Sequence, residues 1–343
     1  MDARQAFKEL RDEHVRPVYV CCGLETYRMN EFTERLAALL AEPEHREMAV
    51  VRFDTAEHSL DTILEEAQTL PFLVPNKLIL VRDNVVFGSG RDSAKVEHRT
   101  DKLMDYFRQP MDSSVLVFLV AAEKLDERKK LTKRAKEDGF VVTFAPLQPE
   151  ELVQWACGRA TKQGRTMEPA AAEELLKRVG TEMGALAAET DKLCLHAGDK
   201  GTVTAAAVAE LVPASTEQSV FKLTEEIASL RTDRAIALYY DLLKQREEPI
   251  KLMALLVRQF RHMLFVKELG KMGYSPQQMA GQLGLHPYAV KITAEQAKGF
   301  SAGRLTVLLN RLAELDYEMK SGRVDKTLGL EMFLLRTGSE GGA

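Results

Sequence analysis

The first 147 residues alternate short apolar runs with stretches whose apolar residues recur every three or four positions. Continuous apolar runs of about five residues are typical of strands buried on both faces, and their alternation with helical patterns is typical of a parallel sheet. We therefore predict a five-stranded parallel sheet flanked by helices. The predicted strands are 18–22, 49–53, 77–81, 114–120 and 140–144.

The pattern changes near Gln148, after which apolar residues follow helical spacing and the runs close near glycines, a helix stop signal. No strand is predicted from there to the end. We predict an α/β domain over 1–147, a small helical domain over 148–211 and an all-helical domain over 212–337. The last residues, 338–343, are expected to form a disordered tail.

The stretch TLPFLVPNKLILV, residues 69–81, places an apolar segment between a helix and a strand. Residues 77–81 have the pattern of a core strand. Continuing the helical phase at ~100° per residue places Phe72 and Leu73 on the side opposite the helix's apolar stripe, so they should face outward. The stripe predicted to pack on the sheet consists of Leu60, Ile63, Leu64, Ala67 and Leu70.

Pro71 leaves a second arrangement open for the same segment. Proline disfavours helical geometry at Leu70 and removes a backbone donor, so the helix stops or kinks there. A break at that point would allow Phe72 to fold back into the core of its own domain. The residues alone favour neither arrangement.

Composition and charge restrict the class of protein. The chain has 343 residues, 45% apolar and 29% charged, with a net charge of −4, so net charge gives no sign of nucleic-acid affinity. The charged N-terminus and the lack of an apolar run of ~18 residues predict a cytoplasmic protein without a membrane span. The four cysteines show no CxxC spacing and are expected to be reduced core residues: Cys21, Cys22, Cys157 and Cys194.

The motifs of a nucleotide-binding site are missing. After the first predicted strand the chain reads GLETYRMNE, residues 23–31, without the second glycine, lysine and Ser/Thr of a phosphate-binding loop. The segment 88–95, GSGRDSAK, has Ala94 and Lys95 where Gly-Lys-Ser/Thr would be needed. The strand 114–120 runs into Ala-Ala-Glu123, an isolated acid and not a magnesium ligand at the strand end.

Other catalytic constellations are also missing from the sequence. The histidines show no HExxH or zinc spacing, and no GxSxG motif is present. We therefore expect a chain that is not an enzyme and that holds no cofactor and no metal. An active AAA+ ATPase or helicase loader is the disfavoured enzyme hypothesis.

Two segments raise nucleic-acid binding as an alternative. Residues 275–292 resemble a helix-turn-helix, with Ala280 and Val290 facing inward and Gly284 at the turn. The second helix offers only Lys291 for base edges, so two packed helices of a bundle are favoured over a DNA-binding regulator. The segment 126–136 has six basic residues in eleven, and a solvated helix is favoured over a phosphate-facing surface.

Seven stretches taken in order resemble the delta subunit family of the bacterial DNA polymerase III clamp loader, in the form found in Bacillus-type bacteria. The resemblance extends over essentially the whole chain. The stretches are PVYVCCGLETYRMNE, AQTLPFLVPNKLILV, LVFLVAAEKLDERKKL, VGTEMGALAAETDKL, EPIKLMALLVRQFRHML, MAGQLGLHPYAVKI and LAELDYEMKSGRVDKTLGLE.

This resemblance implies a fold and an assembly. The fold is an α/β N-terminal AAA+/RecA-like domain without a working nucleotide site, a small helical lid domain and an all-α collar domain. The collar implies a five-subunit ring with delta-prime and three ATP-binding tau/gamma subunits.

The resemblance also implies a function in DNA replication: the chain binds the beta sliding clamp and stabilises its open form, so that the clamp is loaded on primed DNA. In the family, a helix of the first domain inserts two adjacent apolar residues into a pocket on the clamp. The matching positions are Phe72 and Leu73, and Leu70 and Val74 beside them complete the expected contact. Pro71 departs from the family pattern, so the local backbone stays open.

Overall fold

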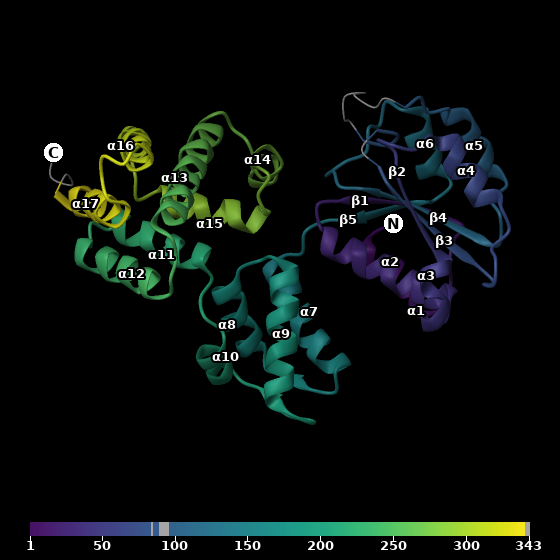
Figure 1. Ribbon diagram of the computed structural model, residues 1–343, viewed down its shortest axis with the longest axis horizontal. Coiled ribbons are helices and arrows are strands. Elements are labelled where there is room, and N and C mark those ends of the chain that lie inside the picture. The colour runs from purple at the N-terminus through teal and green to yellow at the C-terminus, as the bar shows by residue number, and fades with distance from the viewer. Residues whose placement is uncertain (84, 89–95, 340–343) are drawn as a thin grey trace. The chain divides into compact units, whose positions relative to one another are not determined.

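The computed structural model describes residues 1–83, 85–88 and 96–339 (Figure 1). The chain divides into two units, Met1–Leu147 and Gln148–Ala343. Within the described ranges, no helix has the length and apolar character needed to cross a membrane.

The first unit is built on a five-stranded parallel sheet in the order β2-β3-β4-β1-β5. The side chains of β1 are all buried, and β3 and β4 are buried along nearly their whole length, as their continuous apolar runs predict. All five predicted strands are confirmed. Their bounds are β1 (Val18–Gly23), β2 (Val50–Asp54), β3 (Lys77–Arg82), β4 (Ser114–Val120) and β5 (Val141–Phe144).

Helices cover both faces of this sheet (Figure 1). The apolar faces of α1 and α2 pack on one side, around Phe32, and those of α4, α5 and α6 pack on the other, around Phe118. The short α3 follows a 3-10 turn at Pro43–His45 and lies next to α2. The helices are α1 (Ala3–Arg11), α2 (Thr26–Leu40), α3 (Arg46–Ala49), α4 (Leu60–Gln68), α5 (Thr100–Arg108) and α6 (Lys130–Glu137).

The second unit begins with α7 (Pro149–Lys162), α8 (Pro169–Val179), α9 (Met183–Ala197) and α10 (Ala205–Leu211). The prediction that no strand follows residue 148 is wrong, because β6 (Thr166–Met167) pairs in parallel with β7 (Thr202–Val203). Strands of two residues are too short to show the alternation by which a strand is recognised in a sequence.

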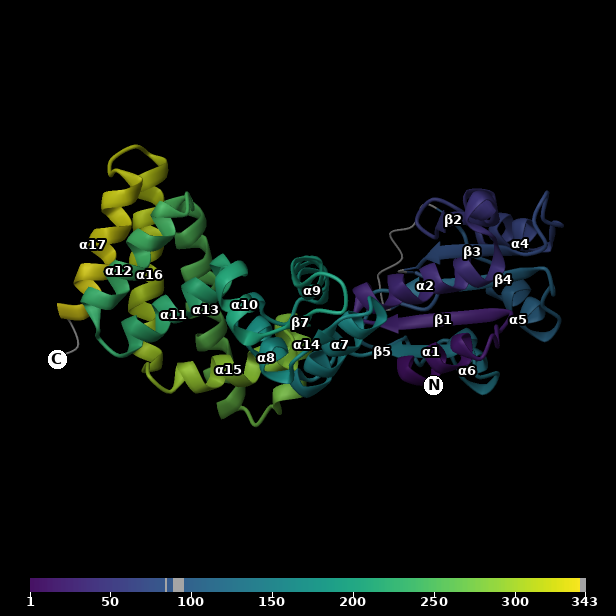
Figure 2. The same cartoon turned by 90° about the horizontal axis from the view of Figure 1, so that it is seen from below.

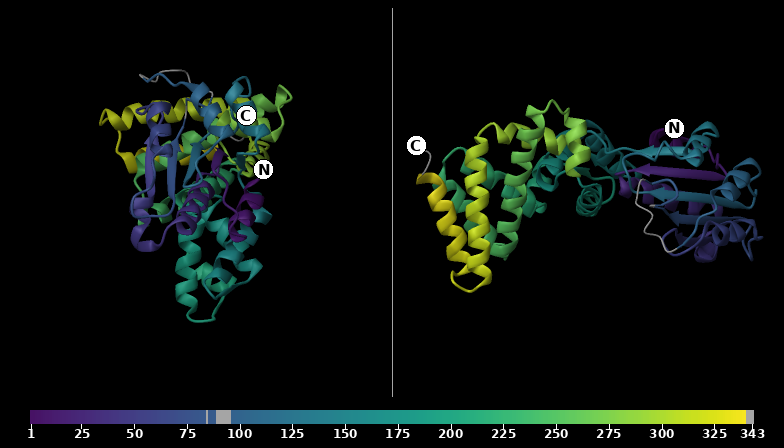
Figure 3. Two further views of the ribbon diagram at one scale, coloured as in Figure 1. Left: turned by 90° about the vertical axis from the view of Figure 1, so that its right-hand side faces the viewer. Right: turned by 90° about the horizontal axis from the view of Figure 1, so that it is seen from above.

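The rest of the second unit is helical, and its core lies between α11, α12, α13, α16 and α17. The long helices α13 and α16 run side by side (Figures 2 and 3). The division at residue 211 between a lid and a collar stays a prediction. The helices are α11 (Thr216–Ala228), α12 (Thr232–Lys244), α13 (Pro249–Lys271), α14 (Pro276–Leu283), α15 (Pro287–Ala297), α16 (Ala302–Lys320) and α17 (Lys326–Ser339).

The predicted tail begins too early. Helix α17 continues through Gly338 and Ser339, so these two residues are helical and not part of a disordered tail. The remaining tail residues, 340–343, lie outside the described residues.

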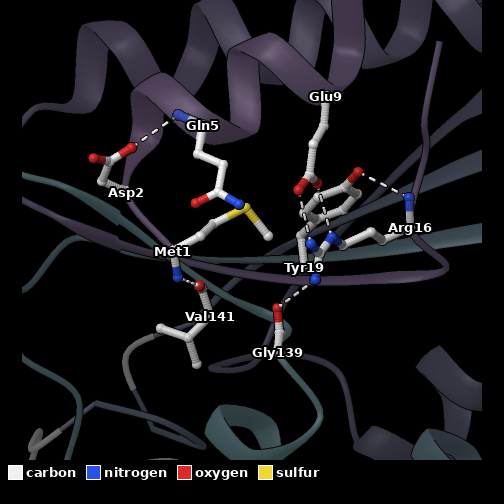
Figure 4. Close-up of polar contacts among 8 residues, drawn as sticks. All are labelled: Met1, Asp2, Gln5, Glu9, Arg16, Tyr19, Gly139 and Val141. Atoms are coloured by element: carbon white, nitrogen blue, oxygen red, sulfur yellow. Dashed lines mark hydrogen bonds and ion pairs between the residues drawn. The ribbon is translucent and has the colours of Figure 1, made fainter. Parts of the chain in front are cut away.

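A polar cluster fixes α1 to the edge of the sheet (Figure 4). The Arg16 guanidinium donates to both carboxylate oxygens of Glu9 at 2.9 and 2.8 Å and to the Gly139 carbonyl at 2.9 Å. The Arg16 amide donates to the Tyr19 hydroxyl at 2.9 Å, and burial raises the pKa of Tyr19 to about 12. One guanidinium therefore joins α1, the start of β1 and the turn before β5.

The Glu9–Arg16 pair generates a prediction about pH. The hydrogen bond from Arg16 lowers the pKa of Glu9 in the folded protein. A lowered pKa contributes stability that is present above the unfolded value, about 4.3 for glutamate, and is lost as the pH falls through the folded value. We expect Glu9→Gln to reduce the free energy of unfolding by about 1 kcal/mol at neutral pH.

Urea denaturation of the parent and of Glu9→Gln at a series of pH values checks this prediction. The difference between the two proteins should shrink as the pH is lowered below about 4. A difference that is as large in acid as at neutral pH would contradict the assignment.

Candidate functional site

The connection between α4 and β3 carries three exposed apolar side chains. Leu70 is 74% exposed, Phe72 80% and Leu73 68%. We call these three residues the exposed tip. Apolar side chains this exposed and this close together are typical of a surface that another molecule covers. The prediction that Phe72 and Leu73 face outward is confirmed, and the alternative of Phe72 in the core is wrong.

Helix α4 ends before the exposed tip. Ser59 caps its N-terminus, accepting a hydrogen bond from the Thr62 amide at 3.2 Å, and the helix ends at Gln68. The Thr69 amide donates to the carbonyls of the last helical turn. Thr69 is already extended, and Pro71 disfavours a return to helical geometry at Leu70, the residue before it.

The early end of α4 corrects one prediction. Leu70 was expected to complete the buried stripe of the helix, and it is exposed instead. The stripe ends with Ala67, which is fully buried. Periodicity alone extended the helix to Leu70, two residues past its end at Gln68, because apolar spacing carries no information about Pro71.

The backbone of the tip turns sharply at Leu73, which has a positive φ of 61°. This left-handed conformation is unfavourable for a residue with a large side chain and persists only where the surrounding structure imposes it. The connection is therefore a defined turn and not an extension of α4.

Val74 lies at the inner end of the tip and is only 9% exposed. It packs with Ala41 and Ala49, which come from the region between α2 and β2. The prediction that Val74 belongs to the contact surface is therefore wrong, because its side chain is already covered by its own domain.

A charged pair that sequence reasoning missed lies beneath the tip. The Lys77 side chain is only 4% exposed, and its ammonium donates to the Glu66 carboxylate at 2.7 Å and to the Glu66 carbonyl. Lys77 is the first residue of β3 and Glu66 lies in the last turn of α4. The signal in the sequence is a lysine at the start of an apolar strand, which predicts a buried charge that needs a partner.

The carboxyl end of β1 is where a phosphate-binding loop would begin. Here β1 ends at Gly23 and α2 begins at Thr26, so only two residues connect them. Gly23 has a φ of +146°, and a Cβ at this position would stand 2.0 Å from the Phe144 carbonyl oxygen. The connection has no room for the glycine-rich loop that cradles phosphates.

The acid at the end of β3 was also missed. Asp83 is fully buried, and its carboxylate accepts hydrogen bonds from the Thr55 hydroxyl at 3.0 Å and from three backbone amides at 2.7 to 2.9 Å. These amides belong to the turn 85–87. Three of these donors reach Oδ1 and one reaches Oδ2, so the buried carboxylate holds the turn in place.

No further nucleotide or metal site is found among the described residues. Glu123 is exposed, as expected of a surface group. Apart from Gly88, the segment 88–95 lies outside the described residues. In the part of the chain that the structure describes, no cluster of three His, Cys, Asp or Glu side chains could hold a metal ion. Cys21, Cys22 and Cys194 are buried, and Cys157 is only partly buried.

The segment 275–292 forms two packed helices, α14 and α15, as predicted. Ala280 and Val290 are buried against Val266 of α13, and Gly284 adopts the left-handed conformation at the turn. This packing accounts for the helix-turn-helix pattern within the helical unit. DNA reading by α15 stays a hypothesis with Lys291 as its exposed cation.

Most of the basic residues in 126–136 are already paired. Lys129 donates to the Gly88 carbonyl at 2.9 Å, while Lys130 and Lys133 are exposed. The pairing favours the solvated helix over a phosphate-facing surface. The ion pairs are Arg128–Asp126, Arg134–Asp138 and Lys136–Glu127.

These features define the class of the protein. The first unit has the parallel five-stranded α/β architecture of an AAA+-like domain, and helices follow it. The two-residue connection after β1 and the missing GK[ST] motif distinguish it from the active members. The described residues of the first unit therefore form an AAA+-like domain whose β1–α2 connection holds no phosphate-binding loop.

Comparison with known proteins narrows this class to one family. The family described as DNA polymerase III, delta subunit matches residues 19–145, and the family described as DNA polymerase III delta subunit, C-terminal domain matches residues 217–337. The chain belongs to the DNA polymerase III delta subunit family.

Two relatives match along nearly the whole chain. The DNA polymerase III subunit delta of Bacillus subtilis (strain 168) is 36% identical over 330 residues, which are 96% of this chain and 95% of that protein. The solved structure of the Bacillus subtilis DNA clamp loader delta protein (YqeN) is 35% identical, with a TM-score of 0.86. That match covers 98% of this chain and 100% of the other.

The short β1–α2 connection generates a prediction about nucleotides. We expect calorimetric titration of the isolated chain with ATP and Mg²⁺ to give only the heat of dilution, because the β1–α2 connection has no room for a loop that holds the phosphates. An AAA+ ATPase with an intact phosphate-binding loop, titrated in the same buffer, is the control. A saturable heat from this chain would contradict the prediction.

Proposed function

We propose that this chain is the subunit of a clamp loader that binds the beta sliding clamp through the exposed tip and stabilises the clamp's open form. The open clamp is then placed on primed DNA during replication. The observation that carries the proposal is the exposure of Phe72 and Leu73 on a defined turn of an otherwise well-packed domain. Membership of the delta subunit family supports it.

The exposed tip has enough apolar surface to anchor a binding partner. Removing a Phe or Leu side chain from water is worth roughly 1.5 to 3 kcal/mol each. A few apolar or aromatic residues at the centre of an interface usually contribute most of its binding free energy. Phe72 and Leu73 together, with Leu70 beside them, therefore have the chemistry to fill an apolar pocket on a partner.

Opening of the clamp follows from linkage and requires no reaction in this chain. A protein that binds the open ring more tightly than the closed ring shifts the equilibrium by the difference between the two affinities. The two-residue connection after β1 has no room for a phosphate-binding loop, which supports a non-catalytic role for this chain. In this proposal ATP hydrolysis belongs to the neighbouring subunits.

The helices after residue 211 are proposed to join the chain to delta-prime and to the tau/gamma subunits, with primed DNA held within the assembly. The match of residues 217–337 to the C-terminal domain of the family supports this assignment. Helix α17 also has exposed apolar residues at positions 328, 332 and 335, a spacing that puts them on one face of the helix.

The double substitution Phe72→Ala and Leu73→Ala tests the clamp contact. We expect the affinity for purified sliding clamp, measured by surface plasmon resonance, to fall at least ~100-fold, because two buried anchors are lost. The melting temperature should stay unchanged, because both side chains are exposed in the free protein.

Leu195→Ala is the matched control, because Leu195 is 77% exposed on α9 and lies outside the tip. This substitution should leave clamp binding unchanged. Retention of full affinity by the double variant would refute the assignment of the tip.

A further inference from the structure

The Lys77 side chain is an uncommon feature in the core of the first unit. It is a charged group with only 4% of its side chain exposed, at the start of a strand that is otherwise apolar. Burying an ammonium group is unfavourable unless it is paired and hydrogen-bonded. Glu66 provides both contacts, through its carboxylate at 2.7 Å and through its backbone carbonyl.

This pair joins the two ends of the connection that carries the exposed tip. Glu66 lies two residues before the end of α4, and Lys77 is the first residue of β3. The Lys77 amide also donates to the Ser113 carbonyl at 3.0 Å, which holds the strand end in the sheet. The pair therefore holds the end of α4 next to the start of β3, and the eight residues 69–76 connect these two points.

Two further contacts limit the free part of the connection. The Thr69 hydroxyl donates to the Glu65 carbonyl at 2.7 Å, which fixes the outgoing end. Val74 is buried with Ala41 and Ala49, which fixes the returning end. Only residues 70–73 project between these points, and they include the whole exposed tip.

We propose that the Lys77–Glu66 pair is a positioning pair, which holds the exposed tip in its binding geometry before the partner arrives. This inference rests on the proposed function of the tip. A connection without the pair would have more conformations, and only a fraction of molecules would present Phe72 and Leu73 together. The apparent dissociation constant rises in inverse proportion to that fraction.

Lys77→Met separates positioning from folding. Methionine has a similar length and suits a buried site, and the Glu66 carboxylate that loses its partner is 36% exposed and stays solvated. No unpaired buried charge is left, so the domain should remain folded. We expect the dissociation constant for the sliding clamp to rise about tenfold and the amides of residues 69–76 to exchange with deuterium faster than in the parent.

Thr55→Val is the matched control. It removes the hydrogen bond from Thr55 to Asp83, which is buried at the opposite end of the strands β2 and β3. It should lower the melting temperature without changing clamp affinity or exchange in 69–76. Equal losses of affinity in both variants would show a general effect of destabilisation and overturn the proposal.

Glu66→Gln provides a second variant that keeps an oxygen acceptor for Lys77. This variant leaves the buried Lys77 ammonium without a counter-charge, so the pair is broken from its other side. Clamp affinity should fall and exchange in 69–76 should become faster, as in Lys77→Met. Full affinity in Lys77→Met overturns the positioning role. If Lys77→Met fails to fold, normal affinity and normal exchange in Glu66→Gln overturn it instead.

Failure of this inference is distinguishable from failure of the proposed function. Parent affinity in the double alanine variant of Phe72 and Leu73 means that the tip is not the contact. Loss of binding in that variant together with full affinity in Lys77→Met means that the tip binds but does not depend on the pair.

Discussion

Burial of the central strands on both faces of the sheet leaves their two ends as the places where these strands meet solvent. Helices cover each face with an apolar core, so the central strands β1, β3 and β4 are buried, whereas the edge strand β2 stays partly exposed. The amino end of β3 carries the connection 69–76 with its exposed apolar residues. The carboxyl ends of β1 and β3, where an active relative would bind nucleotide, carry a two-residue connection and a buried aspartate that holds a turn.

The sheet could be predicted from the sequence because buried parallel strands are continuous apolar runs, and such runs are visible without knowledge of neighbours. Helical phase gave the right direction for Phe72 and Leu73 but not the reason for it, because α4 ends at Gln68 and both residues lie on a separate turn. The same periodicity failed at Leu70, which lies beyond the end of the helix. It could not identify Val74 as buried, because that burial depends on Ala41 and Ala49, which are distant in the sequence.

The missed residues share one property: each is a charged side chain at the end of an apolar strand. The sequence shows that Lys77 and Asp83 interrupt apolar runs, yet it does not show which groups satisfy them. Their partners are a carbonyl and carboxylate of α4 in one case and a turn with Thr55 in the other. A buried charge is defined by its partners, and partners are a property of the fold.

The short connection between Gly23 and α2 limits what amino-acid substitutions could achieve at the carboxyl end of β1. A phosphate-binding loop needs about five residues between its first glycine and its lysine, whereas two residues connect β1 to α2 here. Lysine and serine introduced after Gly23 would fall within the first turns of a helix and not in a loop. A nucleotide site at this position would require an insertion that rebuilds the start of α2, and point substitutions alone would not create one.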